Sequence, residues 1–164
     1  LSRKIAMGAY AEEKQRQLDI RYLKMARIWA ENSYCVRRQV GALIVKDKMI
    51  ISDGYNGTPA GFENICEDEV TGKTKPYVLH AEANAIIAAP RSEMLGSTLY
   101  LVGRDMKTGE LVPNTSSCAM CKRMIINAGI ERVVIRNTPT EYTIVLVSDW
   151  VKNDDSLDDS AIGY

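Results

Sequence analysis

Two short stretches of the chain carry the side chains of a metal site with a carboxylate beside it. His80 and Glu82 stand at the start of one predicted helix, and Cys118 and Cys121 stand at the start of another. Residues i and i+3 lie on the same face of a helix, so the two cysteine sulfurs can reach one ion. An imidazole and two thiolates are ligands that zinc prefers, and three protein ligands leave a fourth position for water. We therefore predict one catalytic zinc ion per chain, held by His80, Cys118 and Cys121.

Glu82 is the candidate proton carrier of this site. A zinc ion with two thiolates and a neutral imidazole is formally neutral, so it acidifies water less than an all-histidine site does. A nearby carboxylate that takes the proton makes up the difference. Side chains two positions apart point away from each other within a helix, so Glu82 reaches the metal only if it shares the first turn with His80. The competing interpretation is a hydrogen-bonded histidine and two buried cysteines with no metal.

Helical patterns alternate with short apolar runs along the rest of the chain, which predicts a layered α/β domain. Predicted helices cover 11–32, 80–89 and 118–128, and predicted strands cover 40–45, 49–52, 97–102 and 132–135, with a further apolar run at 143–147. The polar stretch 59–76 is expected to be irregular, and 103–113 is expected to form a hairpin or flap. The metal-site residues therefore belong to two helices that the strands must bring together.

Length and composition limit the classes of protein to which the chain can belong. Its 164 residues suit a single domain over 1–164, with a core at about 18–148 and an acidic tail at about 149–164 that is expected to fray. The net charge is zero, so long nucleic acid is not an expected partner. No apolar run approaches the roughly 18 residues that cross a bilayer, and no charged and then apolar leader opens the sequence. A cytoplasmic setting with reduced cysteines and no membrane is therefore expected.

The motifs resemble those of the cytidine and deoxycytidylate deaminase family, whose zinc signature is H-x-E followed by P-C-x-x-C. Residues 80–86 and 118–121 carry the signature, and 39–42 and 54–57 most resemble the deoxycytidylate branch. The resemblance extends from about Ile20 to Ile135. It implies a three-layer α-β-α domain of the cytidine-deaminase type with a central mixed five-stranded sheet.

The resemblance also implies an activity, which is zinc-dependent hydrolysis of deoxycytidine monophosphate (dCMP) to deoxyuridine monophosphate (dUMP) and ammonia in pyrimidine nucleotide metabolism. Glu82 would take a proton from the water that attacks C4, and then protonate ring N3 and the leaving ammonia. A homo-oligomer is implied, and deoxycytidine and thymidine triphosphates are typical effectors of the deoxycytidylate branch. The alternatives are deamination of another base (cytidine, guanine or adenosine in transfer RNA) and a zinc-binding module without catalysis. Glu82 argues against the module, because a structural site needs no such carboxylate.

Five further residues are candidates for substrate contact. In the resembled family, an asparagine at the place of Asn56 contacts the sugar or phosphate, although Asn56 also suits a turn. The backbone of Ala81 is implied to meet the base edge. Arg37 and Arg38 are either a guanidinium fork for the 5′-phosphate or two solvated charges. Tyr77 either rims the pocket or lies at an ordinary border between loop and core.

The chain departs from the family pattern at Ser117, where the family has proline. We expect Ser117 to act as the N-cap of the following helix. The stretch between His80 and Cys118 is also longer than usual near 104–113.

Cys35 and Cys66 lie outside the signature. Some family members have a second, structural zinc with cysteines at similar places, but this chain has no second histidine, and carboxylates such as Glu67 would have to serve. We therefore predict free, buried thiols at Cys35 and Cys66 and no second zinc.

Overall fold

The computed structural model describes residues 2–154, with side chains from Met7 onward. Its helices are α1 (Ser2–Trp29), the short 3-10 helix η1 (Ala30–Asn32), α2 (Ala81–Ile87), α3 (Arg91–Met94), α4 (Ala119–Ala128) and α5 (Val147–Asn153). Its strands are β1 (Arg38–Lys46), β2 (Met49–Tyr55), β3 (Thr98–Asp105), β4 (Arg132–Arg136) and β5 (Tyr142–Leu146). Within the described residues, no helix combines the length and the apolar character needed to cross a bilayer.

The five strands form one mixed sheet in the order β2-β1-β3-β4-β5. Neighbouring strands are antiparallel except for β3 and β4, which run parallel with Leu99 opposite Val133. The β1–β2 hairpin turns at Asp47 and Lys48, whose φ angles are 52° and 62°. Positive φ at both central residues is the requirement of the tight turn that matches strand twist.

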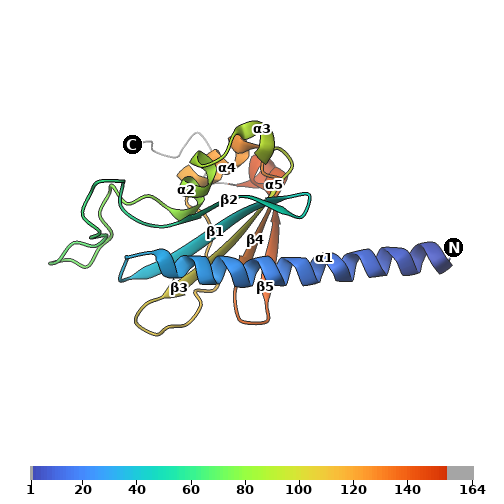
Figure 1. The fold of residues 1–164 in the computed structure, drawn as a ribbon, viewed down its shortest axis with the longest axis horizontal. Helices are drawn as coiled ribbons and strands as arrows, with labels where there is room; N and C mark the ends of the chain where they lie inside the picture. The colour runs from blue at the N-terminus through green and yellow to red at the C-terminus, as the bar shows by residue number, and fades with distance from the viewer. Residues whose placement is uncertain (1, 155–164) are drawn as a thin grey trace.

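The two faces of the sheet are covered by different helices, with α1 along one face and α2 to α5 gathered on the other (Figure 1). Leu99 and Leu101 point toward the second group, where Ala85 and Ile125 contribute to the same core. Alternate side chains of β3 point the other way, because successive residues of a strand face opposite sides. These layers confirm the predicted three-layer α-β-α domain with a central mixed five-stranded sheet.

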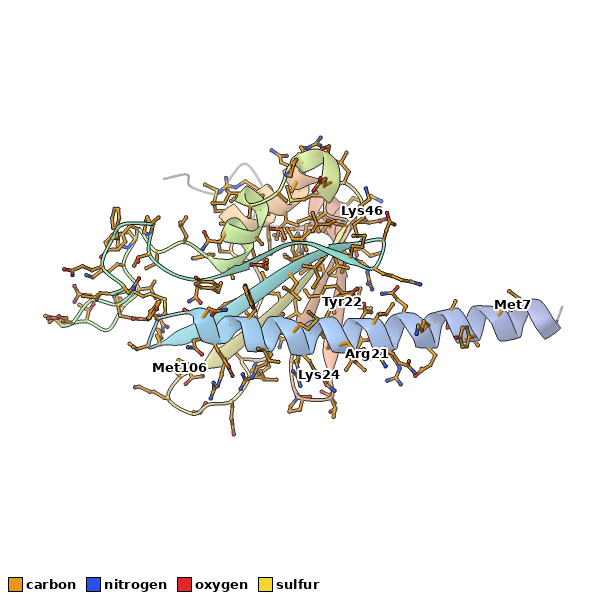
Figure 2. The ribbon with its side chains drawn as sticks, viewed as in Figure 1. Met7, Arg21, Tyr22, Lys24, Lys46 and Met106 are labelled. Carbon is orange, nitrogen blue, oxygen red and sulfur yellow. A yellow bond between two sulfur atoms is a disulfide. The ribbon has the colours of Figure 1, made fainter. Side chains whose placement is uncertain are left out.

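A buried polar network fastens α1 to the sheet. Asp19, only 1% exposed, accepts a hydrogen bond from the Tyr100 hydroxyl at 2.5 Å and another from the Arg132 guanidinium at 2.9 Å. Tyr22 packs its ring on that of Tyr100, with centroids 5.1 Å apart. Figure 2 shows Tyr22 where α1 crosses the sheet and Met7 near the end of the helix that extends past it. Only the second half of α1 therefore takes part in the core.

Both ends of the domain differ from the sequence-based prediction. The first helix begins at Ser2, well before residue 11, and the side chains of Met7 and Tyr10 are exposed, so this part has no apolar periodicity to detect. The expectation that the tail frays from Asp149 is wrong for its first residues, because α5 continues to Asn153 and Trp150 is buried in the core. Residues 155–164 of the tail lie outside the described part of the chain.

The prediction of free thiols at Cys35 and Cys66 is wrong, and so is the expectation that all the cysteines are reduced, because these two residues form a disulfide. They are 31 positions apart in the sequence, and the fold brings their Cα atoms within 5.2 Å. Cys35 lies just before β1, whereas Cys66 lies in the irregular segment between β2 and α2. That segment is bound at its base by the pairing of Gly57 with Leu79. A contact this distant in sequence leaves no local pattern, which explains the missed prediction.

Candidate active site

The first functional group stands at the entry to α2. His80 is the N-cap, with extended backbone angles of −78° and 155°, and Glu82 is the second residue of the helix. Because His80 is not itself helical, the rule that separates side chains two positions apart inside a helix does not apply. The condition that Glu82 and His80 both lie at the first turn of the helix is therefore confirmed.

Strand β2 determines where α2 lies. The Ser52 hydroxyl donates to the carbonyl of Ala85 at 2.5 Å, and the Asn84 amide donates to the carbonyl of Tyr55 at 2.8 Å. Between these two bonds lies Gly54, where an added Cβ would stand 2.6 Å from the Ala85 nitrogen and closer still to the Ala81 carbonyl. The helix that carries His80 and Glu82 can approach the sheet this closely only because residue 54 has no side chain.

The second functional group stands at the entry to α4. Cys118 is the N-cap, and its sulfur accepts the backbone N–H of Cys121 at 3.5 Å. The expected capping role of Ser117 is therefore wrong. The Ser117 side chain is buried, and its hydroxyl has no hydrogen-bond partner within the described structure. The helix ends at Gly129, whose φ of 77° is the left-handed conformation common at helix C-termini.

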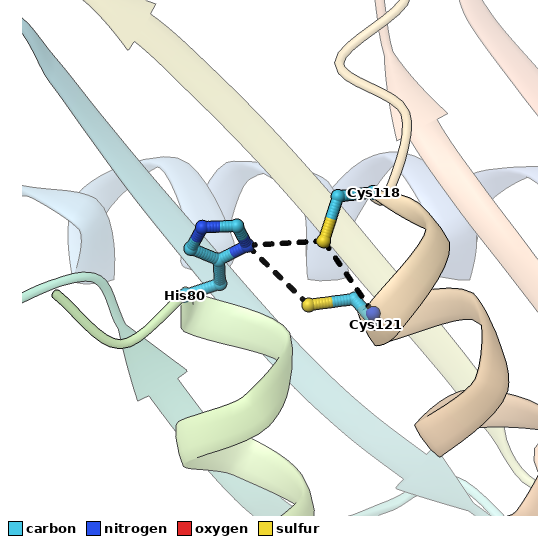
Figure 3. Close-up of side chains that lie close together, drawn as sticks. All are labelled: His80, Cys118 and Cys121. Carbon is cyan, nitrogen blue, oxygen red and sulfur yellow. Dashed lines mark hydrogen bonds between the residues drawn. The ribbon is translucent and has the colours of Figure 1, made fainter. Parts of the chain in front are cut away.

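The two helix entries bring one nitrogen and two sulfurs together (Figure 3). The Nδ1 atom of His80 lies 3.5 Å from the Cys118 sulfur and 3.4 Å from the Cys121 sulfur. Tetrahedral zinc, with bonds of about 2.05 Å to nitrogen and 2.3 Å to sulfur, separates such donors by about 3.5 Å. These three residues therefore fit a zinc ion in both donor type and spacing, and they form the candidate zinc site.

The electrostatics of the group also favour a cation. Burial raises the pKa of the Cys121 thiol above its usual range, and the neighbouring negative charges of Glu82 and Cys118 raise the pKa further. Glu82 is only 5% exposed. A bound metal ion reverses this effect, since a coordinating thiol is deprotonated outright. A positive ion would thus compensate the negative charges of the buried Cys121 sulfur, the buried Glu82 carboxylate and the more exposed Cys118 sulfur beside them.

A cavity of about 240 Å³ opens onto this group. Its wall contains seven of the nine predicted site residues: Arg37, Arg38, Asn56, His80, Ala81, Glu82 and Cys118. Cys121 lies behind the wall, where it is buried. Tyr77 is not part of the wall. Its ring packs on Phe62 with centroids 5.3 Å apart, and the Lys75 ammonium lies 5.7 Å from the ring centroid.

The residues predicted to contact the sugar and phosphate differ in the hydrogen bonds that their side chains make within the protein. The Asn56 side chain accepts the Val40 N–H at 2.8 Å and donates to the Arg38 carbonyl at 2.9 Å, so it ties the end of β2 to the start of β1. One N–H of its amide is left over for a ligand. Arg37 and Arg38 are exposed, and within the described chain neither guanidinium has a hydrogen bond or an ion pair.

Sequence reasoning missed several residues of the cavity wall: Cys35, Val40, Glu67, Thr74, Val78, Thr115 and Ser116. Thr115 and Ser116 had a usable signal, because they directly precede the Cys118 motif on its entry loop. Glu67 was considered only as a possible metal ligand, and its place in the wall depends on the path of the segment between β2 and α2.

Residues 16–137 match the family described as the cytidine and deoxycytidylate deaminase zinc-binding region. The deoxycytidylate deaminase of Mycobacterium phage D29 is 34% identical over 126 residues, which cover 69% of this chain and 89% of the phage protein. The human deoxycytidylate deaminase is also 34% identical, over 69% of this chain and 61% of the human protein.

Among solved structures, this chain is similar to the dCMP deaminase of cyanophage S-TIM5, crystallised with dCMP and dUMP. The two are 38% identical with a TM-score of 0.58, over 71% of this chain and 79% of the phage chain. The resemblance inferred from the His80 and Cys118 motifs is confirmed. The chain belongs to the cytidine and deoxycytidylate deaminase family.

Proposed function

We propose that this protein hydrolyses dCMP to dUMP and ammonia. The observation that carries the proposal is the convergence of His80, Cys118 and Cys121, with buried Glu82 in the wall of the same cavity. The similarity to deoxycytidylate deaminases from phage and human sources supports dCMP as the substrate.

His80, Cys118 and Cys121 would hold the zinc ion, which supplies a Lewis acid that activates water at neutral pH. Glu82 accepts a proton from the water as its oxygen adds to C4 of cytosine. Glu82 delivers this proton to ring N3. Glu82 then takes the second proton, from the new hydroxyl group at C4, and delivers it to the exocyclic amine. The C4–N bond breaks, ammonia leaves, and the C4 oxygen becomes a carbonyl. The low exposure of Glu82 favours these transfers, because few bulk water molecules compete for its protons.

The arginines at the start of β1 support recognition of a monophosphate. Arg37 and Arg38 line the cavity, and within the described structure their guanidinium groups form no hydrogen bond and no ion pair. Charge-assisted hydrogen bonds to phosphate are worth roughly 1.5–3 kcal/mol. Replacing either arginine by alanine is expected to weaken binding of dCMP about tenfold to a hundredfold more than binding of deoxycytidine. Equal losses for the two ligands would show that the arginines are structural.

The remaining contacts are proposed for the base and sugar. Ala81 is completely buried at the cavity wall, where its small side chain allows the pyrimidine ring to approach the backbone. Asn56 contributes its remaining N–H to the sugar or phosphate. Tyr77 is retained as a rim residue, supported only by its position three residues before His80.

A substrate panel tests the proposal directly. The zinc-loaded protein is incubated with dCMP, deoxycytidine, cytidine, guanine and a transfer RNA, and ammonia release is measured. The highest kcat/KM is expected for dCMP. A higher value for any of the other substrates would reject the assignment, and no release from any of them would reject deaminase activity.

The proposal also covers the number of zinc ions per chain, the oligomeric state and the cellular location. One zinc ion per chain is expected, because Cys35 and Cys66 form a disulfide and offer no thiolate. We also propose a single domain over 1–164, a homo-oligomer, regulation by nucleoside triphosphates and a cytoplasmic location. Exposed apolar side chains on α1, such as Ile28 and Trp29, support association between copies.

A further inference from the structure

The disulfide joins two segments that form one side of the active-site cavity. Cys35 lies in the cavity wall just before β1, and Cys66 lies in the long irregular segment that follows β2. Both residues are almost completely buried, at 3% and 1% exposure. The residue after Cys66 is Glu67, which also lines the cavity. The covalent link therefore places the Glu67 backbone beside the residues that lead into β1.

Glu67 binds the backbone at that place with both of its carboxylate oxygens. Oε1 accepts the N–H of Arg37 at 3.1 Å, and Oε2 accepts the N–H of Val36 at 3.3 Å. A carboxylate that receives two successive backbone N–H groups holds the chain in one local conformation. The next residue is Arg38, so both proposed phosphate ligands issue from backbone that Glu67 holds.

The Glu67 carboxylate leaves the guanidinium groups of Arg37 and Arg38 available for a ligand. Among the described residues, Glu67 forms no ion pair with Arg37 or Arg38, and its charge is met by backbone N–H groups. Arg37 and Glu67 also line a second hollow of about 730 Å³ beside the active-site cavity. Arg37 and Glu67 thus form part of the wall that separates this hollow from the active-site cavity. This wall lies where the phosphate of the proposed substrate would bind.

We propose that Glu67 is a positioning residue for the substrate phosphate, with the Cys35–Cys66 disulfide as its anchor. Glu67 holds the backbone of Val36 and Arg37 so that the guanidinium groups of Arg37 and Arg38 face the cavity. This inference rests on the proposed phosphate contact of these arginines. It assigns Glu67 an effect on phosphate recognition and none on zinc or on proton transfer.

The test compares substrates with and without a phosphate. Zinc-loaded Glu67→Ala is assayed with dCMP and with deoxycytidine, and zinc per chain is measured on the same sample. The ratio of kcat/KM for dCMP to that for deoxycytidine is expected to fall about tenfold, through KM for dCMP, with zinc content unchanged. Glu67→Gln should recover part of the ratio, because its carbonyl oxygen still accepts one N–H. Glu69→Ala is the matched control, since it removes the same charge from the same segment, and its ratio should equal that of the parent.

Removal of the disulfide provides a second, independent test. Combined Cys35→Ser and Cys66→Ser substitutions release the anchor but keep the Glu67 carboxylate, so the ratio should fall in the same direction by a smaller factor. Equal losses on dCMP and deoxycytidine in Glu67→Ala would show a merely structural role and overturn the inference. A rise in the ratio would also overturn it, because Glu67 would then be competing with the phosphate for its donors.

The two arginine variants separate failure of this inference from failure of the proposed function. If Arg37→Ala and Arg38→Ala leave the ratio unchanged, the phosphate contact itself is wrong, and the inference falls with it. If they lower the ratio and Glu67→Ala does not, only the positioning role is wrong. With both arginines replaced, adding Glu67→Ala should change the ratio less than twofold, and a larger further fall would show that Glu67 acts independently of them.

Discussion

Substitution of Gly54 by alanine should disturb the zinc site from a distance. The new Cβ would stand 2.6 Å from the Ala85 nitrogen and closer still to the Ala81 carbonyl, whereas ordinary contact begins at 3.4 Å, so α2 must retreat from β2 by at least about 0.8 Å. The atoms in the way are backbone atoms of α2, which cannot rotate aside. Overpacking of this kind costs about 1–3 kcal/mol. In a domain of this size, the melting temperature falls by about 2–4 °C for each kcal/mol.

The same displacement acts on the metal, because His80 precedes α2 directly. Metal–ligand distances tolerate about 0.2 Å, several times less than the required shift. Gly54→Ala should therefore lose zinc affinity as well as stability, measured by calorimetry and by chelator competition. Gly57→Ala is the control from the same motif, since nothing lies within 4 Å of its added Cβ. Parent-like melting temperature and zinc affinity in Gly54→Ala would refute the reasoning, as would equal losses in the control.

Three further outcomes are expected. Cys121→Ala should lose zinc and stability, because one of three converging donors is removed, and full zinc occupancy by elemental analysis would contradict the ligand assignment. Replacing Cys35 and Cys66 by serine opens a loop with a sequence separation of 31 and should cost roughly 3–4 kcal/mol in urea unfolding. An unchanged unfolding midpoint would show that the link is not stabilising. Arg132→Met leaves buried Asp19 without its cationic partner and should cost about 3 kcal/mol, whereas a cost below about 1 kcal/mol would mean that the carboxylate is satisfied without Arg132.

Local patterns were sufficient for much of the fold and for the metal site. The apolar run at 97–102 predicted β3 closely, because a central strand that is buried on both faces leaves a continuous apolar sequence. His80, Cys118 and Cys121 were identified because their residue types and spacing indicate a zinc site, and this signal does not depend on the fold of the residues between them. The sequence also predicted that Glu82 lies in the first turn of α2, because only there can its side chain reach a metal bound by His80.

Features that depend on distant contacts could not be read from the sequence. The Cys35–Cys66 disulfide and the Glu67 contacts join residues about 30 positions apart, and no periodicity records them. Cys118, and not the predicted Ser117, caps α4, because the Cys118 sulfur itself accepts the N–H of Cys121. The hydrogen bonds of the Asn56 side chain to β1 are also tertiary, since a turn residue gives no indication of the strand that it will bind.

The most direct test of the account is Glu82→Gln, with zinc content and single-turnover deamination of dCMP measured on the same sample. Glutamine keeps the size and hydrogen-bonding capacity of the buried side chain but accepts no proton at neutral pH. About one zinc per chain should remain, because Glu82 is not among the three converging donors. The rate should fall by at least 10²–10⁴-fold, since a single general acid–base step is worth about that much and Glu82 serves several. A variant that keeps its zinc and a rate within tenfold of the parent would contradict the role of Glu82 as the proton carrier.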